Sequence, residues 1–95
     1  MILAKVVGTV VCSIKNDGLF GAKYLLVEKC NQQGITKNDF IVAFDLVGAG
    51  SNELVLVSEG SPARETELTI NKPLDALIVG IIDSIEENES IVYTK

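Results

Sequence analysis

Short apolar segments that alternate with polar residues constrain the fold of this chain more than any other feature. Residues 2–13, ILAKVVGTVVCS, carry small or apolar residues at even positions and Lys5, Thr9 and Ser13 at odd positions. A period of two residues is typical of a half-buried β-strand. No segment shows a helical period long enough for a βαβ crossover. The sequence therefore predicts an all-β fold.

Turn residues divide the chain into six predicted strands, and Ser61 and Pro62 are placed to begin one short helix. The predicted strands are residues 2–13, 23–29, 39–45, 53–57, 75–85 and 90–94. In the third strand, Phe40, Val42 and Phe44 share one face. Short strands at this spacing indicate one domain over residues 1–95, a small closed OB-like β-barrel of about six strands.

Two segments are apolar on both faces, LVLV at 54–57 and LIVGII at 77–82. A small antiparallel barrel normally turns its outer face to water, so its strands should alternate. Continuous apolar segments imply that the outer face is covered. The short helix could cover one of these strands, but another subunit is the more economical cover. We therefore expect the chain to associate with itself or with a partner.

Composition excludes several classes of function. The chain has a net charge of -5 and only 8 Lys and Arg, so a basic surface for nucleic acid is not expected. It has no histidine, which rules out Ser–His and Cys–His catalytic pairs. Cys12 and Cys30 are expected to be reduced, because free cysteine packs as a small hydrophobic residue. Reduced cysteines fit an intracellular location. No segment has the apolar length of a membrane-spanning helix, so we expect no membrane partner.

The segment VGAGSNELVLV, residues 47–57, has the glycine content of a phosphate-binding loop but not its pattern. A dinucleotide fingerprint requires a third glycine at its sixth position, followed by a helix. Here Glu53 occupies that position and a strand follows. We interpret Gly48, Ala49 and Gly50 as a turn without bulky side chains, where another backbone can come close.

Acidic residues could in principle form a carboxylate-based active site, because paired carboxylates carry out glycosidase-type chemistry. We favour a simpler interpretation, in which these residues end strands or solvate a turn. The residues concerned are Asp45, Asp75, Asp83, Glu86, Glu87 and Glu89. A small carboxylate enzyme nevertheless remains one alternative function. A second is an OB-like binding module for nucleic acid or a peptide, which predicts a monomer or dimer.

Three blocks of the sequence, taken in order, resemble the EutN/CcmL family of bacterial microcompartment vertex proteins. They are AKVVGTVVCS, DLVGAGSNELVLVSEGSPAR and PLDALIVGIIDSI, and GAKYLLVE between the first two also fits. The resemblance spans essentially the whole chain. Asn52 stands where many members carry glycine, and Pro62 where members carry a small or polar residue. Asn tolerates left-handed backbone, so the turn can survive the first change.

The resemblance implies a structural shell protein without enzymatic activity and without a required cofactor. It implies a compact β-barrel that assembles as a cyclic pentamer, which we expect ahead of a hexamer. Such pentamers occupy the corners of a polyhedral shell whose facets are hexameric proteins. The shell lies in the cytoplasm and encloses enzymes, as in carboxysomes and metabolosomes.

The resemblance also suggests roles for particular residues. Five copies meeting on an axis would leave little room for side chains, so Gly48, Ala49 and Gly50 could ring a narrow opening with Ser51 at its edge. The alternative is a plain hairpin turn within one subunit. Arg64 is expected to contact a neighbouring subunit, with Glu53 as its carboxylate partner. Alternatively, Arg64 ties the short helix to its own barrel.

Overall fold

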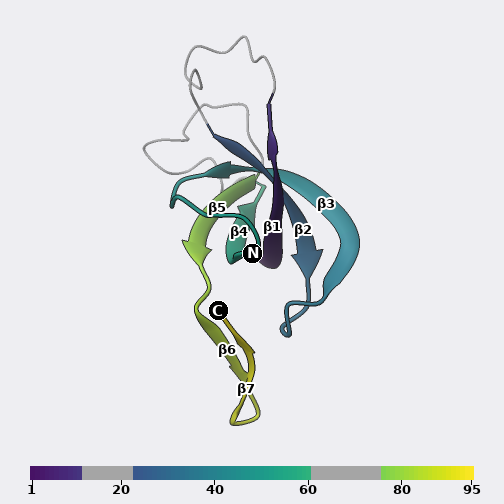
Figure 1. The fold of residues 1–95 in the computed structure, drawn as a ribbon, viewed down its shortest axis with the longest axis vertical. Helices are drawn as coiled ribbons and strands as arrows, with labels where there is room; N and C mark the ends of the chain where they lie inside the picture. Colours follow the sequence, from purple (N-terminus) through teal and green to yellow (C-terminus); the bar gives the residue numbers. More distant parts are fainter. Residues whose placement is uncertain (12–22, 61–75) are drawn as a thin grey trace.

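The computed structural model describes residues 1–11, 23–60 and 76–95, which form a β-barrel with a hairpin beneath it (Figure 1). The strands of the described residues are β1 (Ile2–Val10), β2 (Tyr24–Cys30), β3 (Thr36–Asp45), β4 (Leu54–Glu59), β5 (Ala76–Ile81), β6 (Ser84–Glu87) and β7 (Ser90–Thr94). The first five of these close the barrel in the order β1-β2-β3-β5-β4, with β4 paired to β1. The last two form a separate two-stranded sheet.

The strand pairing confirms the predicted all-β, OB-like barrel, which has five strands where about six were expected, because the predicted strand at 90–94 pairs with β6 outside the barrel. Within the described strands, β3 and β5 run parallel, with Phe44 opposite Leu77 and Asp45 opposite Ile78. The other neighbouring strands are antiparallel. A closed five-stranded barrel of this type leaves no continuous free edge. The predicted short helix, which begins at Ser61, lies outside the described residues.

The inside of the barrel is filled by small and β-branched side chains, as the narrow interior of a small barrel requires. The alternation seen in the sequence places Ala4 and Val6 inside and leaves Val7 exposed. The buried core residues of the described ranges are Ala4, Val6, Leu25, Val27, Ala43, Ala49, Val55, Val57, Ala76 and Ile78. Nine come from barrel strands, and Ala49 comes from the connection between β3 and β4.

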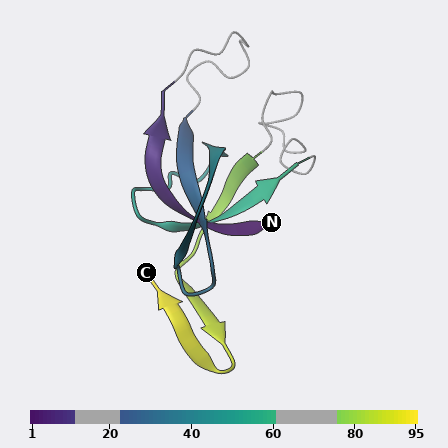
Figure 2. The same cartoon turned by 90° about the vertical axis from the view of Figure 1, so that its right-hand side faces the viewer.

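The predicted single strand over residues 75–85 is wrong, because Ile82 and Asp83 separate β5 from β6. The N–H of Ile82 donates to the carbonyl of Leu54 at 2.9 Å, and beyond that point the chain leaves the barrel. The hairpin extends away from the barrel in both views (Figures 1 and 2). An unbroken apolar sequence does not reveal where a strand leaves one sheet and enters another.

The β6–β7 hairpin turns at Asn88 and Glu89, as expected, and both residues have positive φ, 52° and 66°. Two consecutive positive φ angles match the tight turns that favour hairpins. The base of this hairpin packs, through Tyr93, against Gly34 in the turn between β2 and β3. A Cβ added to Gly34 would lie 3.2 Å from the ring of Tyr93 and 3.5 Å from Leu54. An isolated hairpin is only marginally stable in water, so this contact supports it.

The outer face of the barrel is partly covered by the chain itself. Leu54 and Leu77 are 2% and 1% exposed, yet neither belongs to the inner core. Leu54 lies beside Gly34 and Tyr93, as described above. Leu77 packs with Tyr24, Phe44 and Leu46 in a second cluster, in which the two rings meet edge to face at 5.8 Å. The cover expected from another subunit is thus supplied within the chain at these two positions.

Candidate functional site

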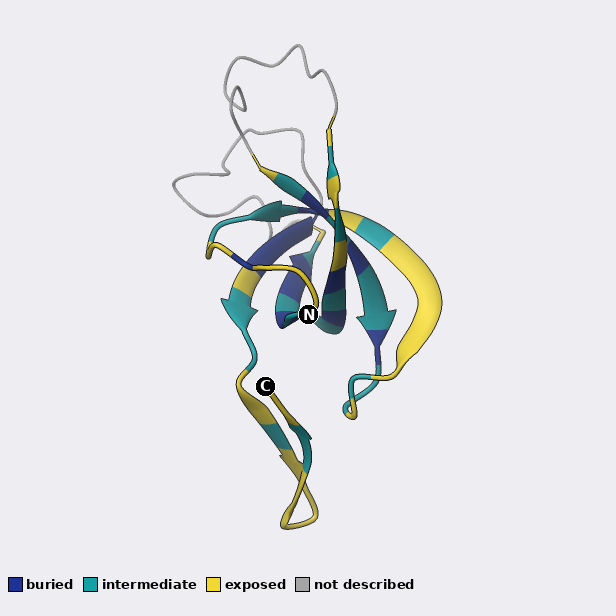
Figure 3. Cartoon of the chain, viewed as in Figure 1, coloured by how far each residue is buried: buried dark blue, intermediate teal, exposed yellow. Residues whose placement is uncertain are grey.

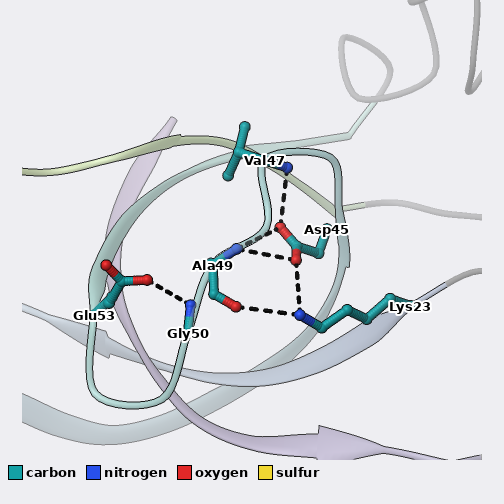
Figure 4. A network of polar contacts seen from close by, with 6 residues as sticks. All are labelled: Lys23, Asp45, Val47, Ala49, Gly50 and Glu53. Atoms are coloured by element: carbon teal, nitrogen blue, oxygen red, sulfur yellow. Dashed lines mark hydrogen bonds and ion pairs between the residues drawn. The ribbon is translucent and has the colours of Figure 1, made fainter.

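The candidate site is the glycine loop, residues 46–53, which joins β3 to β4 (Figure 4). Its first half is organised by Asp45, the last residue of β3, whose side chain is 1% exposed. The Val47 N–H donates to Asp45 Oδ1 at 3.1 Å, and the Ala49 N–H donates to both carboxylate oxygens, at 3.3 and 3.1 Å. A carboxylate that accepts from backbone two and four residues later folds the chain back on itself.

Lys23 supplies the positive charge that the buried Asp45 carboxylate needs. The Lys23 Nζ lies 3.3 Å from Asp45 Oδ2 and donates to the carbonyl oxygen of Ala49 at 3.3 Å. The backbone joins the same two residues, because the Asp45 N–H donates to the Lys23 carbonyl at 3.0 Å. A buried charge is tolerated when it is both paired and hydrogen-bonded. This half of the loop is therefore fixed within one subunit.

The second half of the loop is organised by Glu53. Its carboxylate accepts a hydrogen bond from the Gly50 N–H and lies 3.0 Å from Lys95 Nζ. The Gly50 N–H, followed by the hydrogen bond from Lys95, holds the pKa of Glu53 below its ordinary value. The hydrogen bond to Glu53 correspondingly raises the pKa of Lys95. Lys95 is thus tied to the glycine loop.

Two positions in the loop require left-handed backbone, Gly48 at φ 74° and Asn52 at φ 66°. A Cβ added to Gly48 would have no heavy atom within 4 Å. Glycine is therefore favoured there by its conformation and not by crowding within the subunit. Asn52 adopts the left-handed conformation, as expected for its departure from the family pattern, and its N–H donates to Val6 at 2.8 Å.

The structure separates the predicted loop residues into two groups. Gly48, Gly50 and Ser51 are exposed, whereas Ala49 is 2% exposed and packs in the barrel core. Only the first three can therefore present their surface to another molecule, and Ala49 anchors the loop from inside. Glu53 is held by Gly50 and Lys95 of its own chain. Arg64 lies outside the described residues, so its pairing with Glu53 stays a prediction.

Sequence reasoning missed Lys23, Lys95 and the role of Asp45 in the loop. Asp45 ends β3, as expected, but its side chain is buried and bound to the loop. The spacing of Asp45 from Val47 and Ala49 was the available signal, since Asp commonly bonds backbone two residues later. The two lysines gave no local signal, because each meets its partner across a long stretch of sequence.

The described residues offer neither a cluster of metal-ligating side chains nor an activated thiol. In ranges 1–11, 23–60 and 76–95, no three His, Cys, Asp or Glu residues could together hold a metal ion. Burial raises the pKa of the free Cys30 thiol, which disfavours the reactive thiolate. The same ranges contain no helix that could cross a membrane. The carboxylates of Asp45 and Glu53 hydrogen-bond to backbone N–H groups of the glycine loop, and these bonds fix the conformation of its backbone.

Comparison with known proteins gives matches along the whole chain. The carboxysome shell vertex protein CcmL of Synechocystis sp. is 46% identical over 95 residues, which is 100% of this chain and 95% of that protein. The structure of Gloeobacter violaceus CcmL superposes with a TM-score of 0.93 at 39% identity, covering 100% of this chain and 98% of that chain. The GrpN pentameric microcompartment shell protein from Rhodospirillum rubrum gives a TM-score of 0.82 at 42% identity, covering 92% and 99%.

The family profile described as "Ethanolamine utilisation protein EutN/carboxysome" matches residues 1–83. The match includes the five barrel strands and the glycine loop, and it ends between β5 and β6. The chain therefore belongs to the EutN/CcmL family.

Proposed function

We propose that this chain is a structural subunit of a bacterial microcompartment shell in the cytoplasm, and that five copies form a ring at a shell vertex. The 46% identity with the carboxysome shell vertex protein CcmL of Synechocystis sp. over 100% of the chain carries this proposal, and the likeness to the pentameric shell protein GrpN supports the ring of five. A sheet of hexameric facet proteins is flat, so a five-fold unit supplies the curvature that closes it. Ring closure requires heterologous contacts, in which each subunit offers two different surfaces. The proposed function involves no catalysis and no cofactor.

We place the exposed part of the glycine loop, Gly48, Gly50 and Ser51, next to the five-fold axis. These three small exposed residues, two of which flank the buried Ala49, would let five backbones approach closely. The hydrogen bonds to Asp45 and Glu53 support this placement, because they hold the loop in shape before any neighbour arrives. Ser51 would then stand at the edge of a narrow opening.

Substitution of Gly48 tests the axial placement. Gly48→Val should lower the assembled fraction measured by light scattering, but valine also strains a backbone at φ 74°. Gly48→Asn is the sharper variant, because Asn tolerates this conformation and still adds a side chain. A pentamer unchanged by Gly48→Asn would place the loop away from the axis.

The predicted contact between Arg64 and Glu53 is proposed across the subunit boundary. The Glu53 side chain is 22% exposed, so an arginine fork from a neighbour could join the hydrogen bonds from Gly50 and Lys95. A double-mutant cycle on the assembly equilibrium with Arg64→Ala and Glu53→Gln measures the coupling. If the effects of the two substitutions on assembly are additive, Arg64 and Glu53 do not interact.

The proposed function predicts two measurable results. Native mass spectrometry should give five times the subunit mass of 10.2 kDa. Co-expression with hexameric shell proteins of a microcompartment should give closed polyhedra in electron micrographs, and omission of this chain should leave the shells unclosed. A stable monomer that never joins a shell would overturn the proposal.

The alternative function, an OB-like module for nucleic acid, finds little support in the described aromatic residues. Base-stacking sites present aromatic faces within a basic groove. Tyr24 and Phe44 instead pack against each other and against Leu77. Phe40 is half exposed, but acidic residues Glu28 and Asp39 lie close to it in the sheet and the chain.

A further inference from the structure

We propose that the outer face of β2 and β3 is the surface against which a neighbouring copy of this chain packs. This inference rests on the proposed ring and names one of its two contact surfaces. We define the β2–β3 face as the outward side chains of Leu26, Phe40 and Val42.

Backbone geometry brings these side chains together. The hydrogen bond from the Asp45 N–H to the Lys23 carbonyl makes this pair a hydrogen-bonded pair of the antiparallel ladder. Because such pairs alternate with non-hydrogen-bonded ones, the rows of Leu26 with Val42 and of Glu28 with Phe40 are the closely spaced kind. Side chains in these rows interact directly across the strands.

The rows that alternate with these two point into the barrel. Leu25 stands opposite Ala43 and Val27 opposite Ile41, and the first three of these residues are buried in the inner core. The alternation of side chains therefore turns the β2–β3 face outward.

The β2–β3 face is apolar and open. Phe40 is 50% exposed and Val42 is 46% exposed, and most of the β3 ribbon has the yellow colour of exposed residues in Figure 3. Gly8 stands opposite Leu26 on β1 and has no side chain that could shield it. The surface continues along β3 to Phe44, which already packs on Leu77. Adjacent apolar side chains on two neighbouring strands, with Phe40 and Val42 about half exposed, indicate an interaction surface.

The charges around the face favour a copy of the same chain as the partner. Identical subunits with a net charge of -5 repel one another, so they can meet closely only where charge is locally balanced. Beside the β2–β3 face, Lys5 stands opposite Glu28, so one positive and one negative side chain flank its apolar residues. A balanced pair of charges next to an apolar centre is typical of a protein–protein interface. This pair gives no excess positive charge that would suit nucleic acid.

Phe40→Glu tests the assignment, with Ile35→Glu as the matched control. Ile35 is 59% exposed and lies in the turn after β2, outside the β2–β3 face. Native mass spectrometry at equal subunit concentration should show pentamers for wild type and Ile35→Glu, and mainly monomers for Phe40→Glu with an unchanged circular dichroism spectrum. If Phe40→Glu fails to fold, Val42→Glu at the adjacent position carries the same test.

Mixing wild type with tagged Phe40→Glu tests whether the contact is heterologous. The variant keeps its other surface, so it should end growing chains and give open oligomers with one variant subunit each. If Phe40→Glu forms as much pentamer as Ile35→Glu, the inference is overturned, whereas the proposed pentameric ring is still supported. Mixtures without any mixed oligomer would overturn it too, because the face would then pair only with itself. A monomeric wild type would instead overturn the proposed function.

Discussion

Asp45 is the residue on which the shape of the glycine loop depends most. Its buried carboxylate satisfies two backbone N–H groups and the ammonium of Lys23. A single sequence cannot distinguish an acid that ends a strand in water from one that folds back into the barrel. The position of Lys23 decides between the two, and Lys23 comes close to Asp45 only because β2 pairs with β3.

Removal of the Asp45 carboxylate should therefore destabilise the fold strongly. Asp45→Ala leaves the Val47 and Ala49 N–H groups without their acceptor and Lys23, whose side chain is 52% exposed, without its partner, so we expect a loss of about 1–3 kcal/mol in the free energy of unfolding. Asp45→Asn should cost less, because its amide oxygen can still accept from one N–H. Urea unfolding at a fixed subunit concentration measures both. Asp39→Asn is the control, since the Asp39 side chain is 61% exposed and its ion pair with Lys29 spans 3.7 Å.

Two glycines with similar backbone allow conformational strain to be separated from crowding. Gly48 and Gly34 have φ of 74° and 80°, but a Cβ would meet open space at Gly48 and the ring of Tyr93 at Gly34. We expect Gly48→Ala to cost about 1 kcal/mol through strain alone. Gly34→Ala should cost clearly more, because Tyr93 must also move. If both variants lost the same free energy of unfolding in urea, the Tyr93 ring would be able to move away from Gly34 without cost.

At the scale of elements, alternation in the sequence predicted the barrel strands but not where the barrel ends. Residues 77–82 are apolar on both faces, so nothing in their pattern marks the break at Ile82 and Asp83. The break depends on the hydrogen bond from Ile82 to Leu54 and on the packing of Tyr93 against Gly34. Both are contacts between residues distant in sequence, which periodicity does not report.

The link between the hairpin and the glycine loop should depend on pH. The folded chain lowers the pKa of Glu53, so the ionised form stabilises the fold, and this contribution is lost as pH falls through the folded value. The folded chain raises the pKa of Lys95, so that contribution is lost as pH rises through its folded value. The link should hold between about pH 5 and pH 10, given the ordinary pKa values of Glu and Lys.

Nuclear magnetic resonance can follow this link directly. The amide proton of Gly50 should shift with acid in step with the Glu53 carboxyl, and Glu53→Gln should abolish that shift. Glu87→Gln is the control, because Glu87 accepts from Gln32 at 3.1 Å and has no contact with the loop. A Gly50 amide that ignores the Glu53 titration would contradict the hydrogen bond.

At the scale of the whole molecule, we expected the chain to associate because apolar surface would otherwise be exposed, but part of the apolar surface we pointed to is covered by the chain itself. The doubly apolar segments suggested a missing cover, yet Leu54 and Leu77 are covered within the chain. Apolar side chains that remain open lie on β3, where Phe40 and Val42 share the outer face, and on β5, where Val79 of the doubly apolar segment is 38% exposed. A sequence with apolar residues on both faces of β3 cannot say which face points inward; closure of the barrel decides it.

Salt distinguishes an apolar ring from an ionic complex. Each subunit carries a net charge of -5, so assembly brings like charges together, and screening should weaken this repulsion more than it weakens the apolar contact. Raising the salt from about 20 mM to about 300 mM shortens the Debye length roughly fourfold, and the concentration for half-assembly, measured by sedimentation, should fall. A binding module for nucleic acid behaves in the opposite way, since salt weakens its complex. If assembly instead weakened with salt, intersubunit ion pairs such as the proposed Arg64–Glu53 contact, and not the β2–β3 face, would hold the ring together.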